Sequence, residues 1–145
     1  MNRRHAIVLG SAALIGASLS MPAKAGDVKA GETVDYAPGL IQEALADGKT
    51  VFVDFAADWC STCARQERVI NALRGENPAY NENIMFVRVD WDEFGRAEVS
   101  TSRNIPRRST LLVLRGEEEL GRIVAGTATE EIQALLDTAL SAATS

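Results

Sequence analysis

The sequence predicts an α/β domain in which one mixed β-sheet of four to five strands is covered by helices on both faces. Apolar strand-like runs alternate with helical segments along most of the chain, which is typical of parallel crossover connections. Two strand-like runs near the C-terminus follow each other across a short turn and add an antiparallel pair. With 145 residues and no visible internal repeat, the chain has the size of one domain.

The first half of the domain should begin with a short edge strand at 34–36 and a helix between Pro38 and Asp47. Proline suits the first turn of a helix, and the apolar residues that follow it have helical spacing. The next run, 51–55, is apolar and short, as expected of a buried strand. Residues 64–74 are rich in helix formers, and the segment should end at Gly75.

The second half should contain a loop with one helical turn at 76–83, where Asn residues and a proline gather. Apolar runs then predict strands, and polar segments between them predict connections. In order, we expect a strand at 84–90, a turn at 91–95, a weak helix at 96–103, a strand at 110–114 and an edge strand at 120–125. A last helix should open at the capping-box spacing of Thr127 and Glu130. Its apolar face would consist of Ile132, Leu135, Leu136, Ala139 and Leu140.

Residues 1–25 have the pattern of a cleaved secretory signal peptide. Arg3 and Arg4 give a basic start, 6–19 is apolar, and 23–25 is an A-x-A cleavage site. The apolar part is shorter than a membrane span and contains Gly and Ser, so a retained anchor is the weaker interpretation. We therefore expect a periplasmic protein exported by the general secretory route, with 26–145 as its folded domain. The paired arginines leave the twin-arginine route open.

Removal of this segment would leave 12 basic and 20 acidic residues, a net charge of −8, because Arg3, Arg4 and Lys24 are lost and no acid is. Such a charge argues against nucleic acid as a partner. The only histidine, His5, would also be lost. Ser-His and Cys-His catalysis are then excluded, and no imidazole remains for a metal. We expect neither a metal site nor a bound cofactor.

The sequence Ala57-Asp58-Trp59-Cys60-Ser61-Thr62-Cys63 lies where the buried strand ends and the next helix begins. Its two cysteines are the only ones in the chain, and their spacing places them on one face of a helix, within bridging distance. At a helix N-terminus, unpaired N–H groups and the helix dipole stabilise a thiolate. Cys60 is therefore the candidate nucleophile and Cys63 the resolving thiol. A purely structural disulfide is less favoured, because so short a loop gains little stabilisation.

The order of elements, with Asp-Trp-Cys-x-x-Cys at the end of the second strand, resembles the thioredoxin superfamily over nearly all of 26–145. The motif, followed by a charged helix without proline, is most similar to periplasmic thioredoxin-like proteins and the C-terminal domain of the reductant carrier DsbD. The resemblance implies a thioredoxin fold and a redox-active Cys60–Cys63 disulfide.

The same resemblance implies roles for further residues. Asp54 falls on the family's buried acid, which assists proton transfer at the inner cysteine, and an acid inside an apolar strand is in any case expected to titrate high. Arg88, near a family lysine, would favour its ionised form. Trp59, Ser109 and Thr110 would lie on the substrate-binding side.

The family's cis-proline is the one clear departure. Without a gap its position is Ser109, whereas Pro106 reaches that position only if the loop rearranges. A cis bond before serine costs about 2.5–4 kcal/mol. We therefore expect the Arg108–Ser109 bond to be trans or the backbone to be strained there.

These observations predict a monomeric periplasmic thiol–disulfide oxidoreductase that reduces protein disulfides through a mixed disulfide. Its two cysteines would be recharged by a membrane electron donor of the DsbD or CcdA type, as the resemblance implies. Three alternatives remain open. The same fold can serve as a thiol oxidase, two chains can share a metal or iron–sulfur cluster through their cysteines, or the domain can bind a partner without catalysis.

Overall fold

The computed structural model describes residues 31–145. The predicted signal peptide, residues 1–25, lies outside the described residues. Five strands and six helices make up the described chain, and no helix in it is long and apolar enough to cross a membrane. In order they are β1 (Thr33–Asp35), α1 (Leu40–Ala46), β2 (Thr50–Ala56), α2 (Ser61–Glu76), α3 (Pro78–Asn83), β3 (Ile84–Asp90), α4 (Trp91–Phe94), α5 (Glu98–Thr101), β4 (Thr110–Arg115), β5 (Glu118–Val124) and α6 (Thr129–Ala143).

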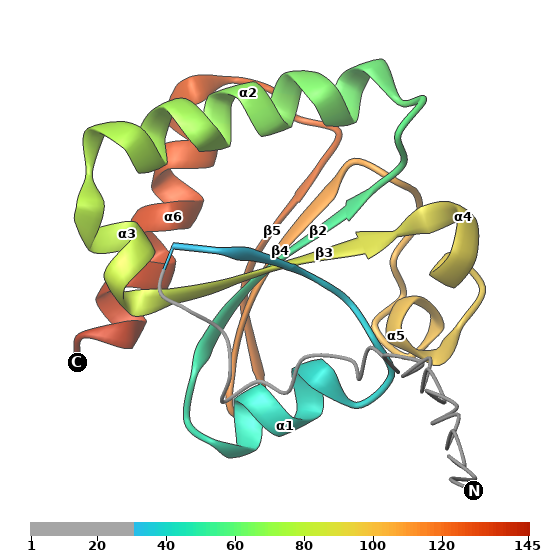
Figure 1. The fold of residues 1–145 in the computed structure, drawn as a ribbon, viewed down its shortest axis with the longest axis horizontal. Coiled ribbons are helices and arrows are strands. Elements are labelled where there is room, and N and C mark those ends of the chain that lie inside the picture. Colours follow the sequence, from blue (N-terminus) through green and yellow to red (C-terminus); the bar gives the residue numbers. More distant parts are fainter. Residues whose placement is uncertain (1–30) are drawn as a thin grey trace, which may run out of the picture.

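The strands form one mixed sheet in the order β1-β3-β2-β4-β5, which confirms the predicted fold class. β1, β3 and β2 are parallel to one another, whereas β4 is antiparallel to β2 and β5 is antiparallel to β4. β2 is therefore the central strand, hydrogen-bonded on both sides (Figure 1). Its C-terminal end, where the cysteine motif begins, is held in the middle of the sheet.

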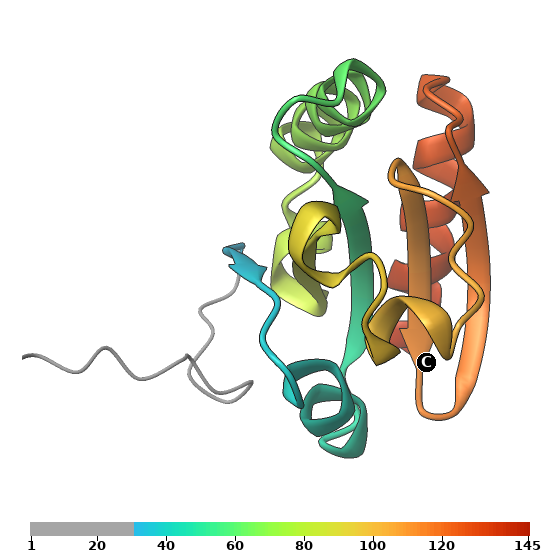
Figure 2. The same ribbon diagram turned by 90° about the vertical axis from the view of Figure 1, so that its right-hand side faces the viewer.

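Helices cover both faces of the sheet, and strand residues alternate between them as the period of two requires (Figure 1). Val51, Val53 and Phe55 of β2 belong to one core cluster, together with residues of α1 and α5. Phe52 of β2 belongs to the opposite cluster, with residues of α2, α3 and α6. Figure 2 shows α6 running along β4 and β5. Asp54, two residues from Phe52, is therefore directed to the face that α2 covers.

Several boundaries differ from the sequence prediction. The predicted capping box is wrong: α6 begins at Thr129, its N-cap is Ala128, and no side chain caps it. Pro38 precedes α1, whose N-cap is Gly39 with φ of 91°. The helix α2 continues through Gly75 to Glu76, because Asn77 provides both its C-cap and the side-chain N-cap of α3. The predicted turn at 91–95 is the short helix α4, capped by the Asp90 carboxylate.

The far end of α2 is fixed by a buried arginine. The Arg74 guanidinium donates to Asn81 Oδ1 at 2.7 Å, to Thr33 Oγ1 at 2.8 Å and to the Gly31 carbonyl at 2.7 Å. It also lies over the Phe86 ring, 3.8 Å from its centroid. Burial lowers the Arg74 pKa. These contacts join α2 to β1, β3 and α3, so the helix that carries the cysteines is anchored at its C-terminal end.

Candidate functional site at the N-terminus of α2

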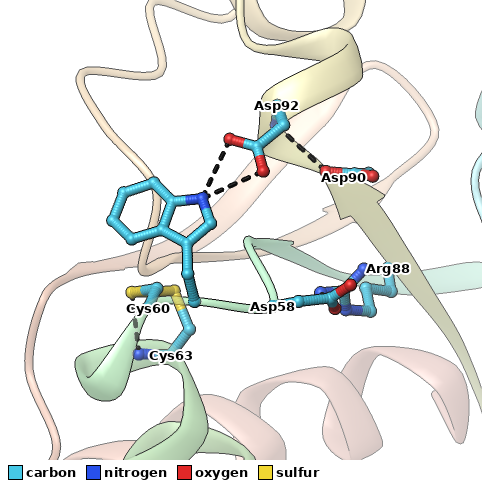
Figure 3. A network of polar contacts seen from close by, with 7 residues as sticks. Asp58, Cys60, Cys63, Arg88, Asp90 and Asp92 are labelled. Carbon is cyan, nitrogen blue, oxygen red and sulfur yellow. Dashed lines mark hydrogen bonds and ion pairs between the residues drawn. A yellow bond between two sulfur atoms is a disulfide. The ribbon is translucent and has the colours of Figure 1, made fainter.

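Cys60 and Cys63 are joined by a disulfide at the corner between β2 and α2 (Figure 3). Cys60 is the N-cap of α2, and its Sγ accepts a hydrogen bond from the Cys63 backbone N–H at 3.1 Å. Such a bond to sulfur strengthens when the sulfur becomes a thiolate, because the acceptor is then charged. Both cysteines are buried, with 4% and 3% of their surface exposed. The predicted placement of the pair is confirmed, and its geometry suits a nucleophilic thiolate at Cys60.

Ser109 lies directly against the two sulfurs. Its Oγ is 3.2 Å from Cys60 Sγ and 3.1 Å from Cys63 Sγ, and the whole residue is buried. Because the sulfurs of a disulfide carry no hydrogen, the serine hydroxyl is the donor in this state. Ser109 therefore occupies the position opposite the disulfide, whereas Pro106 is exposed on the loop before it.

The backbone at Ser109 is trans and left-handed, and no cis peptide bond occurs in residues 31–145. Its φ of 66° is rare for a residue other than glycine and incompatible with proline, whose ring holds φ near −65°. Three hydrogen bonds hold this conformation. The Ser109 N–H donates to the Phe55 carbonyl at 2.7 Å, and its carbonyl accepts from the Ala125 N–H and from Gln66 Nε2, both at 2.9 Å. The site thus differs from a cis-proline loop in its backbone as well as in its side chain.

Gln66 is a site residue that the sequence analysis missed. It is fully buried, and its Nε2 also donates to the Gly126 carbonyl at 2.9 Å, so it joins α2 to the loops on either side of the β4–β5 hairpin. Its Oε1 is buried without a hydrogen-bond partner within residues 31–145. A signal was present: Gln66 shares the helical spacing of the buried residues Cys63, Ile70 and Leu73. A polar residue on a buried stripe is expected to have a specific partner.

Asp54 lies in the middle of β2 on the face covered by α2. Its Oδ1 is fully enclosed and unpartnered in the described part of the chain, and the residue lines a small pocket of about 70 Å³ with Glu67 of α2 and Arg88 of β3. Burial raises the Asp54 pKa to about 7; the positive charge of Arg88 lowers it and the negative charge of Glu67 raises it. A carboxyl that titrates near neutral pH suits general acid–base chemistry.

Arg88 is paired with Asp58 rather than with Asp54. It is the register partner of Asp54 on the neighbouring strand, but its Nη2 donates to Asp58 Oδ1 at 2.9 Å (Figure 3). The Asp58 side chain is almost fully exposed, so this surface ion pair contributes little to stability. Within the described residues, the ion-pair partner of Arg88 is therefore Asp58 and not Asp54.

Trp59 is the exposed aromatic side chain beside the disulfide, with 61% of its surface accessible. Its Nε1 donates to both carboxylate oxygens of Asp92, at 3.1 and 2.9 Å, and the Arg108 guanidinium lies over its ring, 4.4 Å from the centroid. Trp59 and Arg108, together with Trp91 and Arg96, line an open pocket of about 490 Å³. The indole is therefore fixed in place on a surface that a partner can reach.

Thr110, which the resemblance placed on the substrate side, is fully buried at the start of β4. Its hydroxyl donates to the Arg107 carbonyl at 2.7 Å, and its backbone is in register with Phe55 and Val124. The structure thus brings Ser109 to the sulfurs and Trp59 to the neighbouring surface, whereas the Thr110 hydroxyl is engaged within its own loop.

Among residues 31–145, no group of three or more His, Cys, Asp or Glu side chains is arranged to hold a metal ion. Cys60 and Cys63 provide two thiolate ligands, half of what an iron–sulfur cluster requires. The shared-cluster alternative therefore needs a second chain.

Comparison with known proteins places these features in a family. The family model described as Thioredoxin-like matches residues 32–112. The chain is 33% identical over 112 residues to the H-type thioredoxin of Brassica campestris, which covers 77% of this chain and 85% of that protein. It is 34% identical over 97 residues to Thioredoxin H2-1 of Oryza sativa subsp. japonica, which covers 67% of this chain and 65% of the longer rice protein.

Solved structures agree with this assignment. A protein named Trxlp from Edwardsiella tarda EIB202 superposes with a TM-score of 0.64 at 28% identity, over 72% of this chain and 98% of that one. The thioredoxin NaTrxh from Nicotiana alata superposes with a TM-score of 0.57 at 26% identity, over 83% of this chain and 96% of that one. Together with the disulfide at the N-terminus of α2, these matches show that the chain belongs to the thioredoxin-like family and is a thiol–disulfide oxidoreductase with the redox pair Cys60 and Cys63.

Proposed function

We propose that the protein reduces disulfide bonds of other proteins in the periplasm. The observation that carries the proposal is the position of Cys60 Sγ, at the N-cap of α2 with the Cys63 N–H directed at it. Hydrogen bonds to this sulfur favour its thiolate, which is the attacking species in disulfide exchange. The exposed Trp59 beside it offers a docking surface for a protein substrate.

The reaction proceeds in two exchanges. The Cys60 thiolate attacks one sulfur of the substrate disulfide, a mixed disulfide forms, and the other substrate sulfur leaves as a thiolate. Cys63 then loses its proton to Asp54 and attacks Cys60 Sγ, which closes the Cys60–Cys63 disulfide and releases the second substrate sulfur. Two electrons pass from the cysteine pair to the substrate. Asp54 suits the proton step because its pKa of about 7 allows it to accept a proton near neutral pH.

The direction of electron flow is tested by the reduction potential. We expect the purified domain to equilibrate with glutathione at a reducing potential of about −270 mV and to reduce the interchain disulfides of insulin. A potential of about −120 mV would instead identify an oxidase. The oxidase is a real alternative, because hydrogen bonds that stabilise the thiolate also stabilise the reduced protein. A protein whose cysteines do not exchange with glutathione at all would contradict both functions.

The periplasmic location rests on residues 1–25, whose basic, apolar and A-x-A segments have the signal-peptide pattern. Fusion of the full chain to a reporter that is active only after export tests it. We expect export and cleavage near Ala25, and loss of both when charged residues interrupt 6–19. Replacing Arg3 and Arg4 by lysines should leave export intact if the general secretory route is used. A reporter that stays inactive with the native segment would refute the location.

A reductase in an oxidising compartment needs a source of electrons. We propose a membrane-embedded thiol carrier of the DsbD or CcdA type, which would reduce the Cys60–Cys63 disulfide by the same exchange chemistry. The open pocket beside Trp59, with its arginines and acids, adjoins the motif that such a carrier must reach. In cells, loss of the carrier should leave the cysteine pair oxidised, which alkylation of free thiols detects.

A further inference from the structure

Ser109 is the side chain whose chemistry the thiol-exchange function does not yet use. Its backbone N–H and carbonyl are both engaged, by Phe55 on one side and by Ala125 and Gln66 on the other. Only the hydroxyl is left, and it is enclosed at 3.2 Å from Cys60 Sγ and 3.1 Å from Cys63 Sγ. Within residues 31–145 the hydroxyl has the two sulfurs as its hydrogen-bond partners, so its proton is directed at the reacting atoms.

We propose that Ser109 is a catalytic residue whose hydroxyl donates a hydrogen bond to whichever cysteine sulfur carries the negative charge during exchange. This inference rests on the exchange reaction of Cys60 and Cys63. One hydroxyl proton serves one acceptor at a time. It stabilises Cys60 Sγ as the attacking thiolate, and it can turn to Cys63 Sγ when that thiol has lost its proton to Asp54. No atom is transferred to or from Ser109, so the electron balance of the reaction is unchanged.

The unusual backbone is what makes this possible. With φ of 66°, the Ser109 side chain faces the disulfide from the neighbouring loop while its main chain bonds to the sheet. Gln66 acts as a positioning residue, because its Nε2 holds the Ser109 carbonyl from the same helix that carries Cys63. A positive φ at a non-glycine residue costs free energy, and such strain is often found where function requires a fixed geometry.

The hydrogen bond should have a thermodynamic consequence. A hydrogen bond to a charged acceptor is stronger than one to a neutral acceptor, so the hydroxyl stabilises the thiolate more than the disulfide. It therefore lowers the pKa of the Cys60 thiol and shifts the redox equilibrium toward the reduced protein. Removing the hydroxyl should make the protein a slower nucleophile at neutral pH and a stronger reductant.

The test compares Ser109→Ala and Ser109→Gly with the wild-type protein. Alanine keeps the Cβ and therefore the backbone strain, whereas glycine adopts a φ of 66° without steric cost. If the alanine variant does not fold, the glycine variant provides the test. We expect both to raise the Cys60 thiol pKa by about one unit, which means a roughly tenfold smaller thiolate fraction at neutral pH. The pH dependence of the alkylation rate of the reduced protein measures this.

The redox equilibrium with glutathione should shift in both variants by up to about tenfold toward the oxidised protein, equivalent to about 30 mV. Ser100→Ala is the matched control. Ser100 is a buried serine of α5 whose hydroxyl donates to the Phe94 carbonyl at 2.8 Å, so its loss should affect stability but not the thiol pKa. The charged groups on the elements around the disulfide, Asp54 of β2, Asp92 of α4 and Arg108 of the preceding loop, remain in every variant.

Unchanged thiol pKa and unchanged redox equilibrium in both Ser109 variants would overturn the proposal, and so would equal shifts in Ser100→Ala. These readouts do not depend on a protein substrate. If the wild-type protein failed to reduce insulin while its Ser109 variants showed the expected pKa shift, the proposed reductase function would fail and the role of Ser109 would stand.

Discussion

Replacing Cys63 by serine should trap substrates on Cys60 as stable mixed disulfides, whereas replacing Cys60 by serine should abolish both trapping and turnover. Cys60 Sγ is the N-cap of α2 and accepts the Cys63 N–H, so its thiolate is the one that the helix terminus stabilises. Cys63 lies one turn further along the helix, where its role is to attack Cys60. Without it, the first exchange occurs and the second does not.

The measurement is covalent capture. The Cys63→Ser variant, expressed with its native N-terminal segment, should migrate on non-reducing gels in complexes that a reducing agent dissolves, and mass spectrometry should identify the partner proteins. In vitro, a small model disulfide should form one mixed disulfide at Cys60 of each molecule of the Cys63→Ser variant. Cys60→Ser is the matched control, because it retains one cysteine of the same pair. Equal capture by the Cys60→Ser variant would show that the assigned roles of nucleophile and resolving thiol are reversed.

Asp54→Asn should slow release of the mixed disulfide by about 100-fold or more above pH 7, the range typical for loss of a general base. Burial raises the Asp54 pKa to about 7, so the carboxylate that accepts the Cys63 proton is the major form only above that pH. The wild-type release rate should therefore rise with pH through about 7, and the variant should lack this inflection. Single-turnover release of a fluorescent thiol measures both.

Glu67→Gln is the control for the electrostatic argument. Glu67 shares the pocket with Asp54, and its negative charge raises the Asp54 pKa. Its removal should move the inflection to lower pH and leave it present. An Asp54→Asn variant that kept the wild-type rate and pH profile would show that Cys63 loses its proton by another route.

The same raised pKa predicts a pH-dependent stability. Between about pH 4 and 7 the unfolded chain has lost the Asp54 proton and the folded protein still holds it, so the free energy of unfolding falls as pH rises, by at most about 1.4 kcal/mol per unit. Above about 7 both states are ionised and the contribution is constant. Asp54→Asn should remove this slope and be the more stable protein at pH 8. Urea unfolding at several pH values measures the difference.

Local patterns in the sequence predicted most of the fold. Strand runs such as Val51–Phe55 are apolar on both faces because both faces are covered, and their length separates them from helices. The cysteine spacing, the strand before it and the helix formers after it predicted a disulfide at the first turn of α2, which the structure confirms. The high pKa of Asp54 followed from one carboxyl within an apolar strand.

Helix ends were less predictable, because several groups compete to cap them. Thr127 and Glu130 have capping-box spacing, yet α6 begins at Thr129. Gly75 suggested a helix end, but the backbone at that position remains helical, and Asn77 is both the C-cap of α2 and the N-cap of α3. The sequence contains the candidates, whereas tertiary packing decides which of them is used.

By itself, the sequence determined the α/β fold, the thiol chemistry and the absence of any histidine after residue 5, since these depend on residue type and on spacing along the chain. The family resemblance had already placed Ser109 on the substrate-binding side, but only the tertiary structure decided which atoms contact the sulfurs. Ser109 meets Cys60 and Cys63 across 49 and 46 positions, and Gln66 reaches the Ser109 carbonyl across 43. Such contacts depend on how α2 and the loop before β4 pack on the sheet, and no local pattern encodes them. The left-handed backbone of Ser109 is held by the same long-range hydrogen bonds.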